Sequence, residues 1–144
     1  MTSAPIVVGI GDSPASLDAL QTAGVQAAQL KTRVLAIHVI EVQRALPLDA
    51  DLDAESSRGE QLLRRAEHVA AEHGFTIEGE LLQAREAGQA LVEEAKRRGA
   101  AVIVLGISYK RLVGQFDFGR TADYVLRHAG CPVWLVRPAV EVQP

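Results

Sequence analysis

The stretch EAGQALVEEAKRRGAAVIVLG, at residues 86–106, decides the fold of this chain. Residues 86–98 have the apolar spacing of a helix, Gly99 can adopt the left-handed conformation that ends one, and 100–105 is an unbroken apolar run. Such a run predicts a strand that is buried on both faces, as in a parallel sheet. The succession of helix, Gly and strand occurs three times, and strands joined through helices pair in parallel. The sequence therefore predicts a doubly wound α/β sheet.

Five strands and four helices are expected in total. The strands are predicted at 6–10, 33–39, 76–81, 100–105 and 133–136. The helices are predicted from the Asp12-Ser13-Pro14 start to about residue 30, around an apolar stripe at 62–73 that ends at Gly74, at 86–98, and at 119–128. Residues 40–55, which contain Pro47 and several acids, are expected to form a loop.

Length and composition describe one ordinary domain of 144 residues, 48% of them hydrophobic. The single cysteine, Cys131, excludes an intramolecular disulfide and a cysteine-rich metal site. The N-terminus has no secretory signal pattern, so a cytoplasmic protein is expected. No apolar run approaches the length of a bilayer span, so we expect no membrane insertion. The net charge of -3 argues against a nucleic acid partner.

The charge is unevenly distributed along the chain. Residues 41–80 carry ten acidic residues against four arginines, whereas 106–138 carry five basic residues against two acidic ones. An anionic ligand should therefore prefer the C-terminal third. In doubly wound sheets, ligands bind beyond the carboxyl ends of the strands where the strand order reverses. The loops after the first and fourth strands, 11–14 and 106–118, are thus the expected site.

Three segments resemble the universal stress protein family of small adenine-nucleotide-binding α/β domains. They are IVVGIGDS at 6–13, His38-Val39, and TADYVLRHAGCPVWLVR at 121–137. The resemblance covers about 5–138 and implies one domain of the adenine-nucleotide alpha-hydrolase-like type. It further implies the strand order 3-2-1-4-5, a variable loop near 40–55, a C-terminal extension at 139–144, a dimer and, in one branch of the family, an ATP site.

The ATP-binding branch carries a motif of Gly, two residues, Gly, nine residues, Gly, then Ser or Thr, and this frame falls on Gly106, Tyr109, Gly119 and Arg120. Glycines let backbone amides approach phosphate oxygens, and the last glycine opens a helix whose dipole attracts the anion. Tyr109 replaces the second glycine, which costs about 1 to 2 kcal/mol if a left-handed backbone is needed there. Arg120 replaces the hydroxyl, and either pairs with a phosphate or folds across the empty pocket as a plug. Thr121 supplies a hydroxyl one position late.

In the first loop, Gly11 stands where the family usually has Asp, and Asp12 follows one residue late. Capping of the first helix is the expected role of Asp12. By resemblance, Val39 would offer backbone groups to an adenine edge. The ligand is expected to be ATP, AMP or a cyclic nucleotide, or another small phosphorylated molecule. The candidate binding residues are Gly9, Gly11, Asp12, Val39, Gly106, Ser108, Tyr109, Gly119, Arg120 and Thr121.

Several catalytic interpretations are weaker. GQFDFGRT at 114–121 is similar to a phosphate-binding loop with Arg in place of Lys, but it does not directly follow a strand. Ser13 lies where some hydrolases place a nucleophile, but the chain lacks their pairing of Asp and His, so a capping role is expected. A receiver domain needs an acid after the third strand, where Leu81-Leu82-Gln83 stands. The four histidines have no metal-ligand spacing, so no metal site is expected.

The fifth strand predicts an assembly. In the expected order it lies at a sheet edge, yet it consists of Val133, Trp134, Leu135 and Val136. An open edge this apolar promotes aggregation unless it is covered. Pairing the strand with its twofold mate would cover it, so we expect a homodimer with these four residues at the interface.

Three functions follow from these observations. The first is a non-catalytic stress-response or regulatory protein that binds an adenine nucleotide with a degenerate phosphate loop. The second is a regulatory domain or partner of a membrane transporter, because QFDFGRT at 115–121 is similar to universal stress protein domains fused to permeases. The third is a weak ATP hydrolase, which Tyr109 and Arg120 disfavour because they disturb the phosphate site.

Overall fold

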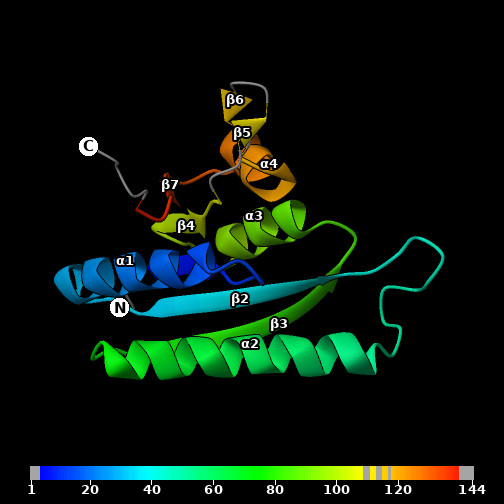
Figure 1. The fold of residues 1–144 in the computed structure, drawn as a ribbon, viewed down its shortest axis with the longest axis horizontal. Coiled ribbons are helices and arrows are strands. Elements are labelled where there is room, and N and C mark those ends of the chain that lie inside the picture. The colour runs from blue at the N-terminus through cyan, green and yellow to red at the C-terminus, as the bar shows by residue number, and fades with distance from the viewer. Residues whose placement is uncertain (1–3, 109–110, 113–114, 117, 140–144) are drawn as a thin grey trace.

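The computed structural model describes residues 4–108, 111–112, 115–116 and 118–139. These form a single domain around a five-stranded parallel sheet with the strand order β3-β2-β1-β4-β7 (Figure 1). The strands of the sheet are β1 (Ile6–Gly9), β2 (Val34–Glu41), β3 (Ile77–Ala84), β4 (Val102–Gly106) and β7 (Val133–Val136). The helices are α1 (Ala15–Leu30), α2 (Asp53–Glu72), α3 (Ala87–Arg98) and α4 (Arg120–His128). The predicted strand order is confirmed, with β7 as the fifth strand.

Helices cover both faces of the sheet. On one face, Ile6 and Val8 of β1 pack with residues of α1 and α2. On the other face, Val7 packs with residues of α3 and α4. All three side chains are fully buried, and so is Ile103 of β4. This burial on both faces explains why β1 and β4 have unbroken apolar sequences.

Glycines end two of the helices as predicted. Gly99 follows α3 with a φ of 63° and ψ of 42°, and its amide bonds to the last turn. Gly74 follows α2 with a φ of 80°. Both conformations favour a residue without a side chain. His73 was predicted on the apolar stripe of α2, but it is exposed and bonds to the Val69 carbonyl at 2.9 Å.

The structure lengthens two strands and adds a hairpin. β2 and β3 pair over eight residues and reach Glu41 and Ala84, beyond the predicted ends. The extension was not predicted because it includes polar residues such as Gln83. The Gln83 side chain donates hydrogen bonds to the carbonyls of Leu48 and Ala50 in the loop between β2 and α2. The short strands β5 (Arg111–Leu112) and β6 (Gln115–Phe116) pair antiparallel and were not predicted. A loop connects β2 to α2, as predicted, but it is shorter than the expected 40–55, because β2 reaches Glu41 and α2 begins at Asp53.

Within the described ranges, no helix combines the length and the hydropathy that a bilayer-spanning segment needs. The C-terminal extension predicted at 139–144 lies outside the described residues, except for Ala139.

Candidate functional site

The end of β4 lies directly against the start of α1. Gly106, the last residue of β4, has no side chain, and a Cβ atom there would overlap the backbone carbonyl of Ala15. Gly106 was predicted as a phosphate-loop glycine, and the structure adds a second reason for glycine at this position, which is close packing against the backbone of α1. Its absent side chain allows the loops after β1 and β4 to approach each other.

Two hydroxyl groups join these loops. The Oγ atoms of Ser13 and Ser108 are 2.8 Å apart, although the residues are far apart in the sequence. Ser13 Oγ also accepts a hydrogen bond from the Ala15 amide at 3.2 Å, so the predicted capping role of Ser13 at α1 is confirmed. The Gly11 amide donates to Ser16 Oγ at 2.9 Å. The two loops that the sequence marks as the expected site therefore form one surface.

The first cavity at this surface has a volume of about 240 Å³ and lies between the carboxyl ends of β1, β2 and β4. A Cβ atom at Gly9 would come within 2.8 Å of the end of the Leu105 side chain, so glycine at this position leaves that side chain its place in the floor of the cavity. Val39 is half-buried in its wall. The remaining predicted residues that line this cavity are Gly11, Asp12, Gly106 and Thr121, together with Gly9.

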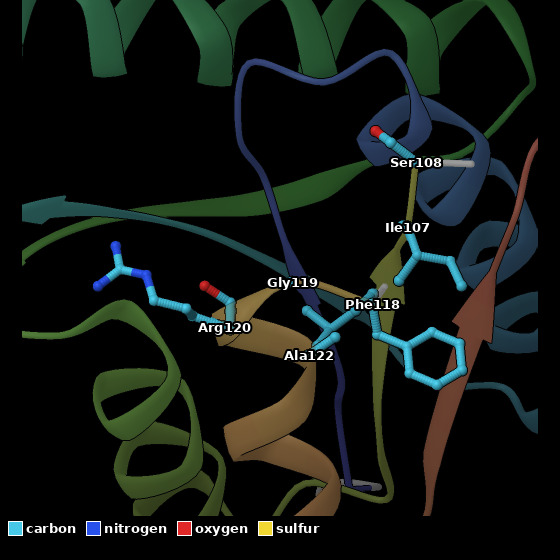
Figure 2. Close-up of a pocket in the computed structure, with 9 residues that line it drawn as sticks. Ile107, Ser108, Phe118, Gly119, Arg120 and Ala122 are labelled. Atoms are coloured by element: carbon cyan, nitrogen blue, oxygen red, sulfur yellow. The ribbon is translucent and has the colours of Figure 1, made fainter. Parts of the chain in front are cut away.

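A second cavity, of about 280 Å³, lies between the end of β4 and the start of α4 (Figure 2). Ser108, Gly119 and Thr121 line it, with the exposed ring of Phe118 on one side. Leu105, Gly106 and Thr121 line both cavities, so the two adjoin each other. We call them together the switch-point groove.

The N-terminus of α4 opens into the second cavity. Gly119 precedes the helix with a φ of 86°, a value that favours glycine. The Asp123 amide bonds to the Gly119 carbonyl, which closes the first turn. The amides at the start of a helix have no partner within it, and the helix dipole makes this end positive. An anion is therefore favoured in this cavity.

Arg120 does not fill the groove. Its side chain is 88% exposed, and Nη2 lies 3.5 Å from Oε1 of Glu41 at the end of β2. Figure 2 shows the guanidinium directed away from Ser108 and Phe118. The predicted plug is therefore wrong, because Glu41 holds the guanidinium outside the cavity. Thr121, one position later, is a hydroxyl residue that lines both cavities of the groove.

Glu41 is a residue of this site that was not predicted from the sequence. Its Oε2 accepts a hydrogen bond from the Ala87 amide at 2.9 Å, so Glu41 caps the first turn of α3. Glu86, which precedes α3, makes no side-chain capping bond of its own. A cap supplied from another element leaves no local signal, such as a Ser or Asp beside the helix start, in the sequence.

Asp12 does not cap α1, contrary to the prediction. Its Oδ1 accepts hydrogen bonds from Nη2 and Nε of Arg58 on α2, at 2.6 and 3.0 Å. Ser13 takes the capping role because its Oγ meets the Ala15 amide. Asp12 remains at the rim of the first cavity, with its carboxylate partly neutralised by an exposed arginine.

His38 is a further residue of the first cavity that the prediction omitted. Its Nδ1 donates to the Ile10 carbonyl at 2.7 Å and thereby joins β2 to the loop after β1. Gly59 of α2 makes room for the ring, since a Cβ there would overlap it. The sequence marked His38-Val39 only through the family resemblance. In the structure, the hydrogen bond to Ile10 explains why a histidine is useful at position 38.

Part of the predicted site lies outside the described residues. This applies to Tyr109, and to Gly114 and Asp117 of the stretch similar to a phosphate-binding loop. Among the residues that are described, no group of three or more His, Cys, Asp or Glu is placed to hold a metal ion.

The model of the universal stress protein family matches residues 3–137. The chain belongs to the universal stress protein family. A universal stress protein of Methanocaldococcus jannaschii is 30% identical over an alignment of 138 residues, and the match covers 92% of this chain and 81% of the relative. A solved universal stress protein of Archaeoglobus fulgidus has a TM-score of 0.79 and 25% identity, and the match covers 93% of this chain and 98% of that one.

A second Archaeoglobus fulgidus structure, determined in complex with dAMP, has a TM-score of 0.77 and 24% identity. This match covers 94% of this chain and 99% of the other. At this identity the likeness shows the shared fold.

Proposed function

We propose that this universal stress protein binds an adenine nucleotide in the switch-point groove. The observation that carries the proposal is that the two cavities adjoin each other at Gly106 and Thr121. The first cavity offers half-apolar walls for a base and sugar, and the second offers the positive end of α4 for a phosphate. The dAMP held by the Archaeoglobus fulgidus protein is a molecule with these two parts.

The proposed roles follow the position of each residue. Val39 and the glycines of the β1 loop would face the adenosine part. Ser108, Gly119 and Thr121 would face the phosphate, through hydroxyl groups and backbone amides. These groups bind an anion without adding charge.

We also propose that the protein acts by binding and not by catalysis, as a cytoplasmic regulatory protein. Ser13 is the groove hydroxyl considered as a nucleophile, and it is hydrogen-bonded to Ser108 and the Ala15 amide instead of to a base. Incubation with ATP and assay of released phosphate tests this proposal. A transporter partner stays a prediction, because the stretch at 115–121 that suggests it lies partly outside the described residues.

The homodimer belongs to the same proposal. β7 lies at the end of the five-stranded sheet and pairs only with β4 among its strands, so its other edge has no strand of this sheet beside it. All four residues of β7, including Trp134, are half-buried and have apolar side chains. A second copy of β7 would satisfy this edge and bury the apolar residues.

Calorimetric titration of the full chain with AMP, ATP, cyclic AMP and adenosine tests the nucleotide proposal. We expect Thr121→Val to weaken AMP binding about ten-fold, because the variant keeps the volume and removes a hydroxyl that faces the phosphate. Adenosine binding should be unchanged. Thr22→Val is the matched control, since Thr22 is half-buried on α1 and does not line the groove. Equal weakening of AMP and adenosine would contradict the assigned role of Thr121.

A further inference from the structure

The ion pair between Glu41 and Arg120 lies beside the second cavity and connects the end of β2 to the start of α4. A side cavity of about 190 Å³ adjoins the groove here, lined by both residues together with Ala87 and Thr121. Arg120 also lines the second cavity. Arg120 thus borders both cavities, and its guanidinium lies on the side of Glu41.

The two members of this pair are held differently. Glu41 is anchored, because one carboxylate oxygen accepts the Ala87 amide while the other faces Arg120. Arg120 is 88% exposed, so little packing opposes rotation of its side chain. An exposed ion pair at 3.5 Å is a weak interaction that a better anion can replace.

A phosphate at the start of α4 is such an anion. It carries more charge than a carboxylate, and arginine pairs with phosphate oxygens through two parallel hydrogen bonds. We propose that Glu41 and the phosphate of the ligand compete for Arg120, which makes Arg120 a phosphate-specific contact that Glu41 restrains. This inference rests on the proposed function and names a specificity determinant of the same site.

The competition has a measurable consequence, which is a change in preference between a nucleotide and its nucleoside. Glu41→Gln keeps an oxygen for the Ala87 amide and removes the charge that holds Arg120. We expect this variant to bind AMP about two- to five-fold more tightly, with adenosine binding unchanged. Arg120→Gln keeps most of the side-chain length and removes the charge, and should weaken AMP binding about three-fold or more.

The double variant separates competition from simple repulsion between Glu41 and a phosphate. If Glu41 acts through Arg120, Glu41→Gln gives no gain in AMP affinity when Arg120→Gln is already present. Glu86→Gln is the matched control, because Glu86 lines the same side cavity but forms no ion pair with Arg120 among the described contacts. The substitution removes the same charge as Glu41→Gln. Its affinity for AMP should stay within about two-fold of the parent protein. Unfolding temperatures of all variants verify that the cap on α3 is kept.

An equal gain in both backgrounds, or no gain in either, would overturn the inference while leaving nucleotide binding established. If the parent protein binds neither AMP nor adenosine, the proposed function itself fails, and the inference fails with it. The adenosine titration therefore distinguishes the two failures.

Discussion

At Gly106 the last residue of β4 lies against the first turn of α1, and a Cβ atom would overlap the Ala15 carbonyl and approach the Ser16 amide. Both obstacles are backbone atoms, which cannot move aside as a flexible side chain can. We expect Gly106→Ala to lower the free energy of unfolding by roughly 1 to 3 kcal/mol, the usual cost of overpacking. Urea denaturation followed by circular dichroism measures this change.

Gly11→Ala is the control for this substitution. A Cβ at Gly11 would meet Ser16 Oγ at 3.9 Å, which is an ordinary contact. The alanine should leave stability unchanged or raise it slightly, because it restricts the unfolded chain. If the two variants are equally stable, the close approach at Gly106 does not constrain the fold as described.

Residues of the candidate site were predictable where their role depends on local backbone chemistry. Gly106 and Gly119 were singled out through the resemblance to the family's ATP-binding motif, and each lies where a strand ends or a helix begins. The role of Asp12 was wrongly predicted because its partner, Arg58, lies 46 residues away in the sequence. Glu41 was missed for the same reason, since only the sheet order places it beside Ala87 and Arg120. Contacts of this kind have no signature in a single sequence.

Helix α3 carries an ionic network at the edge of the sheet. Glu94 is buried and accepts hydrogen bonds from Arg97 at 2.6 and 2.7 Å. These bonds hold the pKa of Glu94 at about 2, below its ordinary value of 4.5. Burial and the neighbouring Glu94 raise the pKa of Glu80, which also pairs with Arg98 at 2.9 Å. The network thus lowers the pKa of Glu94 and raises the pKa of Glu80.

A depressed pKa in the folded state contributes stability above pH 4.5, and this contribution is lost as the pH falls toward 2. We expect Glu94→Gln to be less stable than the parent protein at pH 7 by roughly 1 kcal/mol, because the ion pair with exposed Arg97 is partly screened and the loss of Glu94 relieves the raised pKa of Glu80. The difference should shrink between pH 4.5 and 2, where Glu94 becomes protonated in both states. Urea denaturation across this range measures it. Glu93→Gln, at an exposed position on the same helix, should show no such pH dependence.

Elements were predictable to different degrees. The strand at 133–136 and the helix ends at Gly74 and Gly99 were placed correctly, because apolar runs and left-handed glycines are local signals. The ends of β2 and β3 were predicted too short, since pairing between neighbouring strands extends them through polar residues. The β5–β6 hairpin was missed because its strands have two residues each, too few for any periodicity.

For the molecule as a whole, the free edge of β7 predicts a twofold assembly. Leu135 is half-buried on this strand, and a symmetric interface through this edge would bring the β7 residues of the two copies, Leu135 included, close together. We therefore expect the parent protein to sediment as a dimer at micromolar concentration and Leu135→Lys to sediment as a monomer, because two ammonium groups would be forced together. Leu30→Lys is the control, since Leu30 is 55% exposed at the end of α1, and it should remain dimeric. Trp134 is the single tryptophan, so its emission should shift to shorter wavelength as the parent protein associates. A parent protein that is monomeric at every concentration, with unchanging emission, would show that this edge is covered in another way.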